Sequence, residues 1–289
     1  MLNKKLNVLD GLIPYIKTRE CVLFIGAGMS QIAGCKPWHW IADQLCLRHP
    51  DPSLRNLSDL KNITYLPNYI EACFLQYKSA NKENEYEGVI REAIYENGQL
   101  LETAYKPFMQ NIIDKIKPKF ILTTNIDGCF EKSGFVNLAN ISYKSQDMNI
   151  TKLNNPKLQS FHIHGYIDTL FESVLMDKTY YQRYQDGNLS LFFEHILSHY
   201  TILFLGYGLK EHKLLEILKS RKSNKHYALL STDEFNSTEI KMYLELFNIS
   251  IVEYGDVNMF QQFLTEWCNI NLTNPAEIKE EKIRPSPEH

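Results

Sequence analysis

The 289-residue chain is 44% hydrophobic, has a formal net charge of −3 and contains six cysteines without a CxxC pair. The balanced charge argues against direct binding to nucleic acid or to an anionic membrane surface. No stretch reaches the roughly 18 apolar residues that span a membrane, and the N-terminus lacks the apolar core of a signal peptide. The scattered cysteines disfavour a zinc ribbon and a disulfide framework, so we expect a cytoplasmic protein.

Short apolar runs recur along the chain, and most are followed by a glycine or polar break and then a helical pattern. We predict strands over these runs, at residues 21–25, 120–123, 161–163, 201–205, 226–230 and 249–254. Helices are predicted near 239–247 and over 257–270. Runs that are apolar throughout and alternate with helices are typical of a parallel sheet covered on both faces. We therefore predict a Rossmann-like α/β fold.

Residues 38–116 interrupt this alternation, because about eighty mainly helical residues lie between two predicted strands. A single crossover helix needs far fewer residues. We predict one domain over residues 1–272, with a small helical subdomain inserted at about 38–116. The charged, proline-containing residues 273–289 lack periodicity and are expected to form a disordered tail.

Two glycine-containing motifs follow predicted strands. Gly26–Ser30 (GAGMS) follows the first strand, and residues 205–209 (LGYGL) end a later one. Glycines at these positions let the backbone approach a pyrophosphate, and the next helix offers free N–H groups at its start. Plain tight turns between a strand and a helix explain each motif equally well.

Two further motifs carry polar side chains at strand ends. Asn125 and Asp127 lie in residues 123–127 (TTNID), at the end of a parallel strand where ligands bind; alternatively, Asp127 caps the following helix. His162 and His164 lie in residues 161–165 (FHIHG) and would face the same side of a strand. A histidine at a strand end is more often structural than catalytic, but Gly165 leaves room for a substrate behind His164.

The order and spacing of these four motifs resemble the sirtuin (SIR2) superfamily over residues 21–209. Gly34 and Trp38 also fit the first motif of that family, whereas Pro37 stands one position later than the family's proline. The resemblance implies that NAD binds this chain. It implies NAD-binding roles for Gly26, Ala27, Gly28, Ser30, Trp38, Gly206 and Leu209 and catalytic roles for Asn125, Asp127 and His164.

The chain departs from deacylating sirtuins because no cysteine lies between Cys129 and Cys268, where those enzymes carry a zinc module. We therefore expect no zinc and favour NAD hydrolysis over deacylation. The sequence looks more like the bacterial SIR2-like branch, which implies anti-phage NAD depletion and a partner such as a HerA-type ATPase or an Argonaute-like protein. Because an unregulated NADase would be lethal to its own cell, we also expect control by a partner chain or by assembly into a homo-oligomer.

In the expected mechanism, Asn125 positions water or a ribose hydroxyl, His164 is the general base, and Asp127 orients the ribose or Asn125. The products would be nicotinamide and either ADP-ribose or its cyclic form. Two alternatives remain open: an NAD-dependent protein deacylase, and a non-catalytic subunit that binds NAD or ADP-ribose. A dehydrogenase is disfavoured, because no acidic residue closes a second strand about 20 residues after the first glycine motif.

Overall fold

The structure is a computed structural model, and it describes residues 8–49, 51, 66–95, 102–132, 138–142, 148–172, 177–220, 224–231, 235–255 and 257–272. Within these residues, seven strands form one sheet in the order β3-β4-β2-β1-β5-β6-β7, and all neighbours are parallel. The strands are β1 (Cys21–Ile25), β2 (Ile121–Thr123), β3 (Leu138–Ser142), β4 (Leu158–His162), β5 (Thr201–Leu205), β6 (His226–Ser231) and β7 (Ile249–Tyr254). Without the edge strand β3, this is the strand order of the doubly wound fold. The predicted Rossmann-like α/β class is confirmed.

Most strand predictions agree with the structure. β1, β5 and β7 have the predicted bounds, and β2 and β6 differ from the predictions by one residue at one end. β4 begins three residues earlier than predicted and ends at His162. The edge strand β3 was not predicted.

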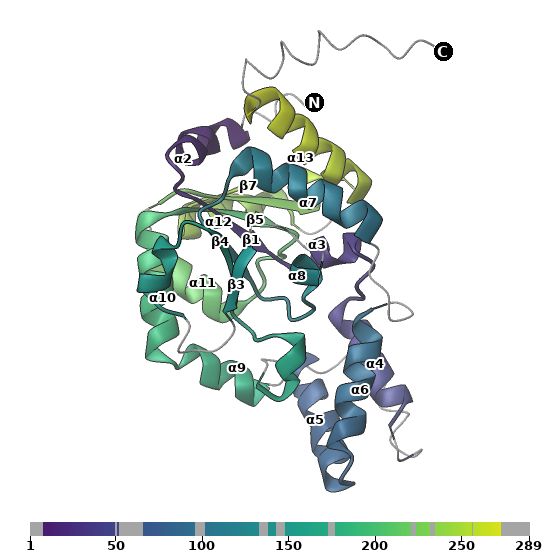
Figure 1. Cartoon of the computed structure of the whole chain (residues 1–289). Helices are drawn as coiled ribbons and strands as arrows, with labels where there is room; N and C mark the ends of the chain where they lie inside the picture. Colours follow the sequence, from purple (N-terminus) through teal and green to yellow (C-terminus); the bar gives the residue numbers. More distant parts are fainter. Residues whose placement is uncertain are drawn as a thin grey trace, which may run out of the picture.

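Helices cover both faces of the sheet (Figure 1). Successive residues of β1 point to opposite faces, so Leu23 and Ile25 join one hydrophobic core while Val22 and Phe24 join the other. The first core includes α2 (Ile13–Lys17), α3 (Ala27–Ile32), α7 (Glu102–Ile116) and α13 (Val257–Leu272). The second includes α10 (Gly187–His199), α11 (His212–Ser220) and α12 (Ser237–Phe247). Burial on both faces explains why these strands are apolar throughout.

Three helices form a small unit that extends beyond the sheet: α4 (Trp38–Leu47), α5 (Leu66–Ser79) and α6 (Glu83–Ile94) (Figure 1). The Tyr77 hydroxyl of α5 donates to the Leu45 carbonyl of α4, and the Tyr77 ring lies 5.7 Å from that of Tyr86 in α6. By contrast, α7 packs along α13, where Phe108 meets Phe260 at 5.9 Å between ring centroids. The helices of the predicted insertion thus pack in two places. The boundaries at 38 and 116 stay a prediction, and the predicted tail lies outside the described residues.

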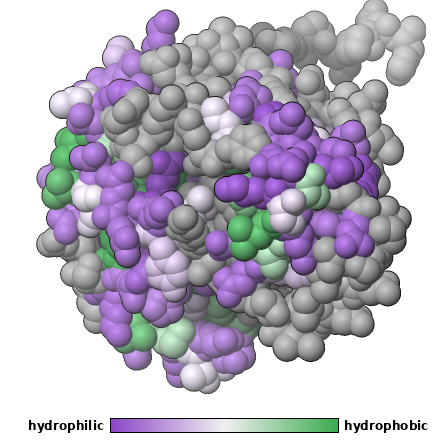
Figure 2. All heavy atoms as spheres, turned by 90° about the horizontal axis from the view of Figure 1, so that it is seen from below, coloured by the Kyte–Doolittle hydropathy of each residue, from purple (hydrophilic) through white to green (hydrophobic). Residues whose placement is uncertain are grey.

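The described residues form no broad apolar face on the side of the molecule that carries these helices. In Figure 2 the described residues are mainly hydrophilic, and hydrophobic residues form small separate spots. Across the described part of the chain, no helix has both the length and the hydrophobicity needed to cross a membrane.

Candidate active site

The two glycine motifs meet where β1 and β5 lie side by side, at the point where the strand order reverses. Gly26 N–H donates to the Leu205 carbonyl and Gly28 N–H to the Gly206 carbonyl, each at 2.9 Å. A Cβ atom on Gly26 would lie 2.4 Å from the Gly206 carbonyl oxygen, and one on Gly206 (φ +60°) would lie 2.5 Å from the Met29 nitrogen. The glycines are therefore required for contact between the loops, and two of the N–H groups expected to hold phosphate bind the chain itself.

Asn125 is connected to the first motif through its side chain. Its Nδ2 donates to Ser30 Oγ at 2.8 Å, and both residues are buried. The loop below is held by Thr123, whose hydroxyl donates to the Ile25 carbonyl at 2.7 Å and accepts from Asn125 N–H at 2.9 Å. The Ser30–Asn125 contact therefore joins two predicted motifs that lie 95 residues apart.

Asp127 has the capping role that the sequence left open. Its Oδ1 accepts from Cys129 N–H at 2.8 Å, at the start of the short helix α8 (Cys129–Lys132). Its carbonyl accepts from the Tyr95 hydroxyl at the end of α6. A side chain used as a cap can still face a ligand, and Asp127 is only half-buried.

Ser30, Asn125 and Asp127 separate two adjoining pockets, because each of them lines both. The first, which we name the Glu131 pocket, is also lined by Tyr105, Glu131 and His162. The second, the Trp38 pocket, is also lined by Ala27, Cys35, Lys36 and Trp38. Five of the ten predicted site residues thus meet here: Ala27, Ser30, Trp38, Asn125 and Asp127.

His164 lies in the turn after β4 and is paired with a carboxylate. Its Nε2 lies 2.9 Å from Glu211 Oε1, which also accepts from the Tyr184 hydroxyl, while Tyr207 donates to Oε2 at 2.7 Å. Burial raises the pKa of Glu211, but the attraction of His164 and these hydrogen bonds outweigh it, so the pKa is lowered. Glu211 is therefore a carboxylate at neutral pH and orients the His164 ring.

Glu211 was missed by the sequence analysis, although a charged residue just after residues 205–209 was an available signal. Among the described residues that line the Glu131 and Trp38 pockets, His164 is absent. Its side chain is 12% exposed. His164 thus lies beside the β5–α11 loop, where it forms a polar cluster with Glu211 and two tyrosines outside the Glu131 and Trp38 pockets.

His162 occupies a different environment, and the prediction that it faces the same side as His164 is wrong. β4 ends at His162, and the chain turns before His164. His162 Nδ1 donates to the Asn125 carbonyl at 2.8 Å, and Nε2 lies 2.7 Å from Glu131 Oε1. Ser160 donates to the same carboxylate oxygen at 2.8 Å.

The His162–Glu131 pair is charged on both sides. Both ring nitrogens of His162 face acceptors, which requires a proton on each. Burial lowers the pKa of His162, but Glu131 and the hydrogen bonds raise it by more. Burial likewise raises the pKa of Glu131, yet the opposing effect of His162 leaves it lowered. A buried ion pair therefore supports the Asn125 backbone, and no motif in the sequence had indicated Glu131.

Leu209 lies in the core and lines neither pocket. It is fully buried in the core beneath α12, and its carbonyl accepts from the Tyr243 hydroxyl at 2.7 Å. Its φ of 51° is left-handed, which costs energy in a residue with a branched side chain. This residue therefore shapes the turn between β5 and α11.

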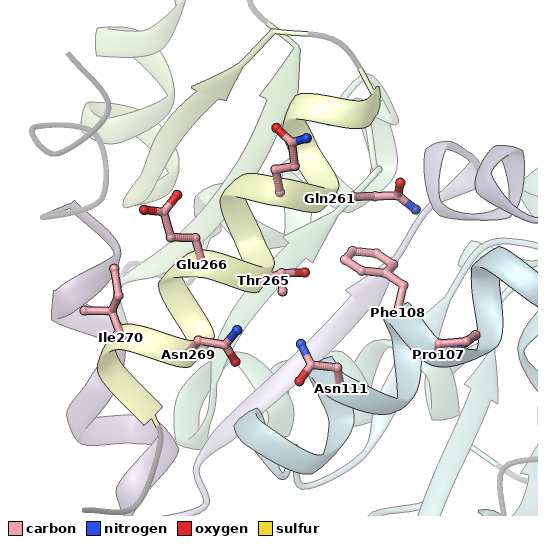
Figure 3. A pocket seen from close by; sticks show the side chains of 9 residues that line it. Pro107, Phe108, Asn111, Gln261, Thr265, Glu266, Asn269 and Ile270 are labelled. Carbon is pink, nitrogen blue, oxygen red and sulfur yellow. The ribbon is translucent and has the colours of Figure 1, made fainter. Parts of the chain in front are cut away.

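A separate surface groove runs between α7 and α13 (Figure 3). Phe108 and Asn111 line it from α7, and Gln261, Thr265 and Asn269 line it from α13. No predicted site residue lies on its walls. The described residues on its walls offer amides, an aromatic ring and the carboxylate of Glu266 but no histidine or cysteine, so the candidate active site remains at the carboxyl ends of β1, β2 and β4.

Comparison with known protein families matches part of the chain to a family model. Residues 119–252 match the family model described as the SIR2-like domain. This range runs from just before β2 into β7, so it contains Asn125, Asp127, His164 and Gly206 but not the Gly26–Ser30 loop. A search of curated proteins finds no match. The match covers slightly less than half of the chain; it supports a place in the sirtuin-like superfamily and NAD-related activity in general.

Proposed function

We propose that this protein hydrolyses NAD at the bond between nicotinamide and ribose. The observation that carries the proposal is the hydrogen bond from Asn125 to Ser30. It places a polar side chain of the SIR2-like region against the first glycine loop, at the carboxyl ends of β1 and β2. Ligands of doubly wound folds bind at this edge of the sheet.

The bond between ribose and the positively charged nicotinamide of NAD is already activated for cleavage. Nicotinamide leaves as a neutral molecule, so the enzyme mainly has to hold the ribose and stabilise an oxocarbenium-like transition state. With Nδ2 of Asn125 held by Ser30, Oδ1 is the atom that would accept a hydrogen bond from the attacking water or a ribose hydroxyl. Asp127 would hold the ribose on the same wall of the Trp38 pocket.

His164 would be the general base. Since its Nε2 donates to Glu211, the neutral ring carries its lone pair on Nδ1. The carboxylate of Glu211 would then stabilise the imidazolium that forms when Nδ1 takes a proton from water. This arrangement requires the ribose to lie between Asn125 and His164. It also requires the phosphates to be held by groups other than the N–H of Gly26 and Gly28, and Lys36 supplies a positive charge on the Trp38 pocket wall.

We further propose that the biological role is anti-phage depletion of NAD in the cytoplasm. This rests on the resemblance to the bacterial SIR2-like branch. An ungated NADase would kill the cell that makes it, so activity would be controlled by homo-oligomerisation or by a partner chain such as a HerA-type ATPase or an Argonaute-like protein.

The test is to incubate the purified full-length chain with NAD alone at neutral pH and to measure nicotinamide release by chromatography. The Asn125→Ala and His164→Ala variants should lose at least about a hundredfold in rate. The matched control is His195→Ala, which changes a half-buried histidine of α10 outside the site. It should keep the rate of the unchanged protein.

The other outcomes separate the alternatives. Nicotinamide release that needs an acylated peptide would make the protein a deacylase. NAD binding by calorimetry without release, even with a partner present, would make it a binding subunit. Full release by the His164→Ala variant would remove this residue from the mechanism.

A further inference from the structure

Two cysteines and an aspartate converge beside the Trp38 pocket, although they come from distant parts of the chain. Cys35 lies in the loop after α3, Asp127 lies between β2 and α8, and Cys129 is the first residue of α8. Their sulfur and carboxylate atoms all lie within 4.8 Å of one another. Both cysteines are buried, and Asp127 is half-buried. Within the described part of the chain, this is the one group of three such donors that is close enough to hold a metal ion.

The backbone around this cluster is held in place on both sides. A glycine in the left-handed region directly precedes each cysteine, Gly34 with φ 82° and Gly128 with φ 67°. A Cβ atom on Gly128 would lie 2.8 Å from the Tyr166 hydroxyl, so the turn before Cys129 needs glycine. Cys35 N–H donates to the Ser30 carbonyl at 3.0 Å. The donors are therefore positioned by the fold before any ligand arrives.

The chemistry of these donors selects one class of ion. Thiolate sulfur favours borderline and soft ions, whereas Mg²⁺ and Ca²⁺ require six or more oxygen ligands. Zn²⁺ takes thiolate and carboxylate ligands in a tetrahedral arrangement, and sites with three protein ligands keep the fourth position open. Cys35 and Asp127 line the Trp38 pocket.

We propose that Cys35, Asp127 and Cys129 form a binding site for a divalent ion of the zinc class. Binding exchanges the two thiol protons for the ion and releases both protons to solvent. The bound ion joins the loop after α3 to the β2–α8 connection, so it links two walls of the Trp38 pocket. This site differs from the zinc module of deacylating sirtuins, because its cysteines precede the His164 motif and stand 94 positions apart.

Proximity of two thiols is not enough for such a site, and the chain offers a comparison. The pKa of Cys73 is raised to about 12, mainly by burial and next by the charge of the Cys46 thiolate. Cys46 and Cys73 are therefore also neighbours. They connect α4 and α5 without a carboxylate at ligand distance among the described residues. The pair Cys46 and Cys73 is therefore the matched control.

The experiment uses Co²⁺ as a spectroscopic probe on the reduced, chelator-treated full-length protein. We expect one Co²⁺ per chain, with the near-ultraviolet absorption of a thiolate–cobalt bond, and displacement of that signal by Zn²⁺. The double variant Cys35→Ser/Cys129→Ser should lose the signal, and Asp127→Asn should weaken binding by more than about tenfold. The double variant Cys46→Ser/Cys73→Ser should bind like the unchanged protein.

A second measurement covers the case in which a variant folds poorly. Zn²⁺ should raise the Tm of the unchanged protein and of the Cys46→Ser/Cys73→Ser variant, because an ion that binds only the folded state stabilises it. It should not raise the Tm of Cys35→Ser/Cys129→Ser. No cobalt–thiolate signal in the unchanged protein, or the same signal after loss of Cys35 and Cys129, would overturn the proposal. Neither readout depends on NAD, so the site stands or falls separately from the proposed NAD hydrolysis.

Discussion

Two histidines near the carboxyl end of β4, only two residues apart in the chain, are each paired with a glutamate. The Nε2–Oε1 distances are nearly the same, 2.7 Å for His162–Glu131 and 2.9 Å for His164–Glu211. The surroundings differ. The side chains of His162 and Glu131 are 2% and 5% exposed, whereas those of His164 and Glu211 are each 12% exposed.

The partners of the two rings differ as well. His162 donates from its second nitrogen to the Asn125 carbonyl, so both of its ring nitrogens hydrogen-bond to the protein. His164 uses Nε2 for its carboxylate, and two tyrosines share that carboxylate. The same pair of side chains thus supports a loop in one place, and in the other we propose that it serves proton transfer. The two pairs differ in burial, since the His162–Glu131 side chains are less exposed than those of His164 and Glu211.

The largest expected effect comes from breaking the buried pair. Glu131→Ala would leave the charged His162 buried without its partner, and we expect the free energy of unfolding to fall by about 3–5 kcal/mol. Urea denaturation measures this. Glu131→Gln, which keeps an acceptor for Ser160 and His162, should lose less. A loss below about 1 kcal/mol for Glu131→Ala would contradict an ion pair here.

A third histidine sharpens the comparison, because it is buried without a carboxylate. His226 accepts from Ile202 N–H through Nδ1, and its Nε2 has no partner within the described structure. Burial lowers the pKa of His226 from 6.5 to about 4. The unfolded chain therefore binds the proton more tightly, and stability should fall as the pH decreases from about 6.5 to 4, by about 3 kcal/mol in all.

The measurement is urea denaturation as a function of pH. His226→Asn keeps an acceptor for Ile202 N–H and removes the titrating group. Its stability should lack this part of the pH dependence. An unchanged slope between pH 6.5 and 4 in the variant would show that other groups cause the acid destabilisation.

The less buried pair, His164–Glu211, is tested by its carboxylate rather than by its histidine. Glu211→Gln removes the charge that stabilises an imidazolium and allows the amide to favour the wrong tautomer of His164. We expect kcat for NAD hydrolysis to fall about a hundredfold, or about 2.7 kcal/mol, with little change in KM. Steady-state kinetics checks this. A change confined to KM would place Glu211 in substrate binding instead.

The smallest expected effect concerns a single hydrogen bond of the buried pair. Ser160→Ala removes one donor to Glu131, which is already partnered by His162. We expect a loss of about 1.5 kcal/mol in the free energy of unfolding, measured by urea denaturation. Ser198→Ala is the control, because that exposed hydroxyl donates to the Glu194 carbonyl of its own helix. It should cost less than Ser160→Ala.

The elements of the fold could be predicted where the local pattern carries the information. Strands buried on both faces are apolar throughout, which is why the bounds of β1, β5 and β7 were predicted to the residue. The edge strand β3 (Leu138–Ser142, LANIS) is interrupted by the polar Asn140, so it resembles a loop. The predicted end of β4 at residue 163 missed a turn that no periodicity indicates.

By itself, the sequence determined the class of the fold, the positions of six of the seven strands and the four motifs at the strand ends, because each depends on a few consecutive residues. Only the tertiary structure decided which polar groups become partners. Glu131 and His162 are 31 positions apart, and His164 and Glu211 are 47 apart. The spacing of Cys35 and Cys129 in the sequence did not indicate that they are close. They meet because parallel strands bring their loops to one edge of the sheet. Such pairs leave no periodic signal along the chain, since their geometry exists only after the sheet has formed.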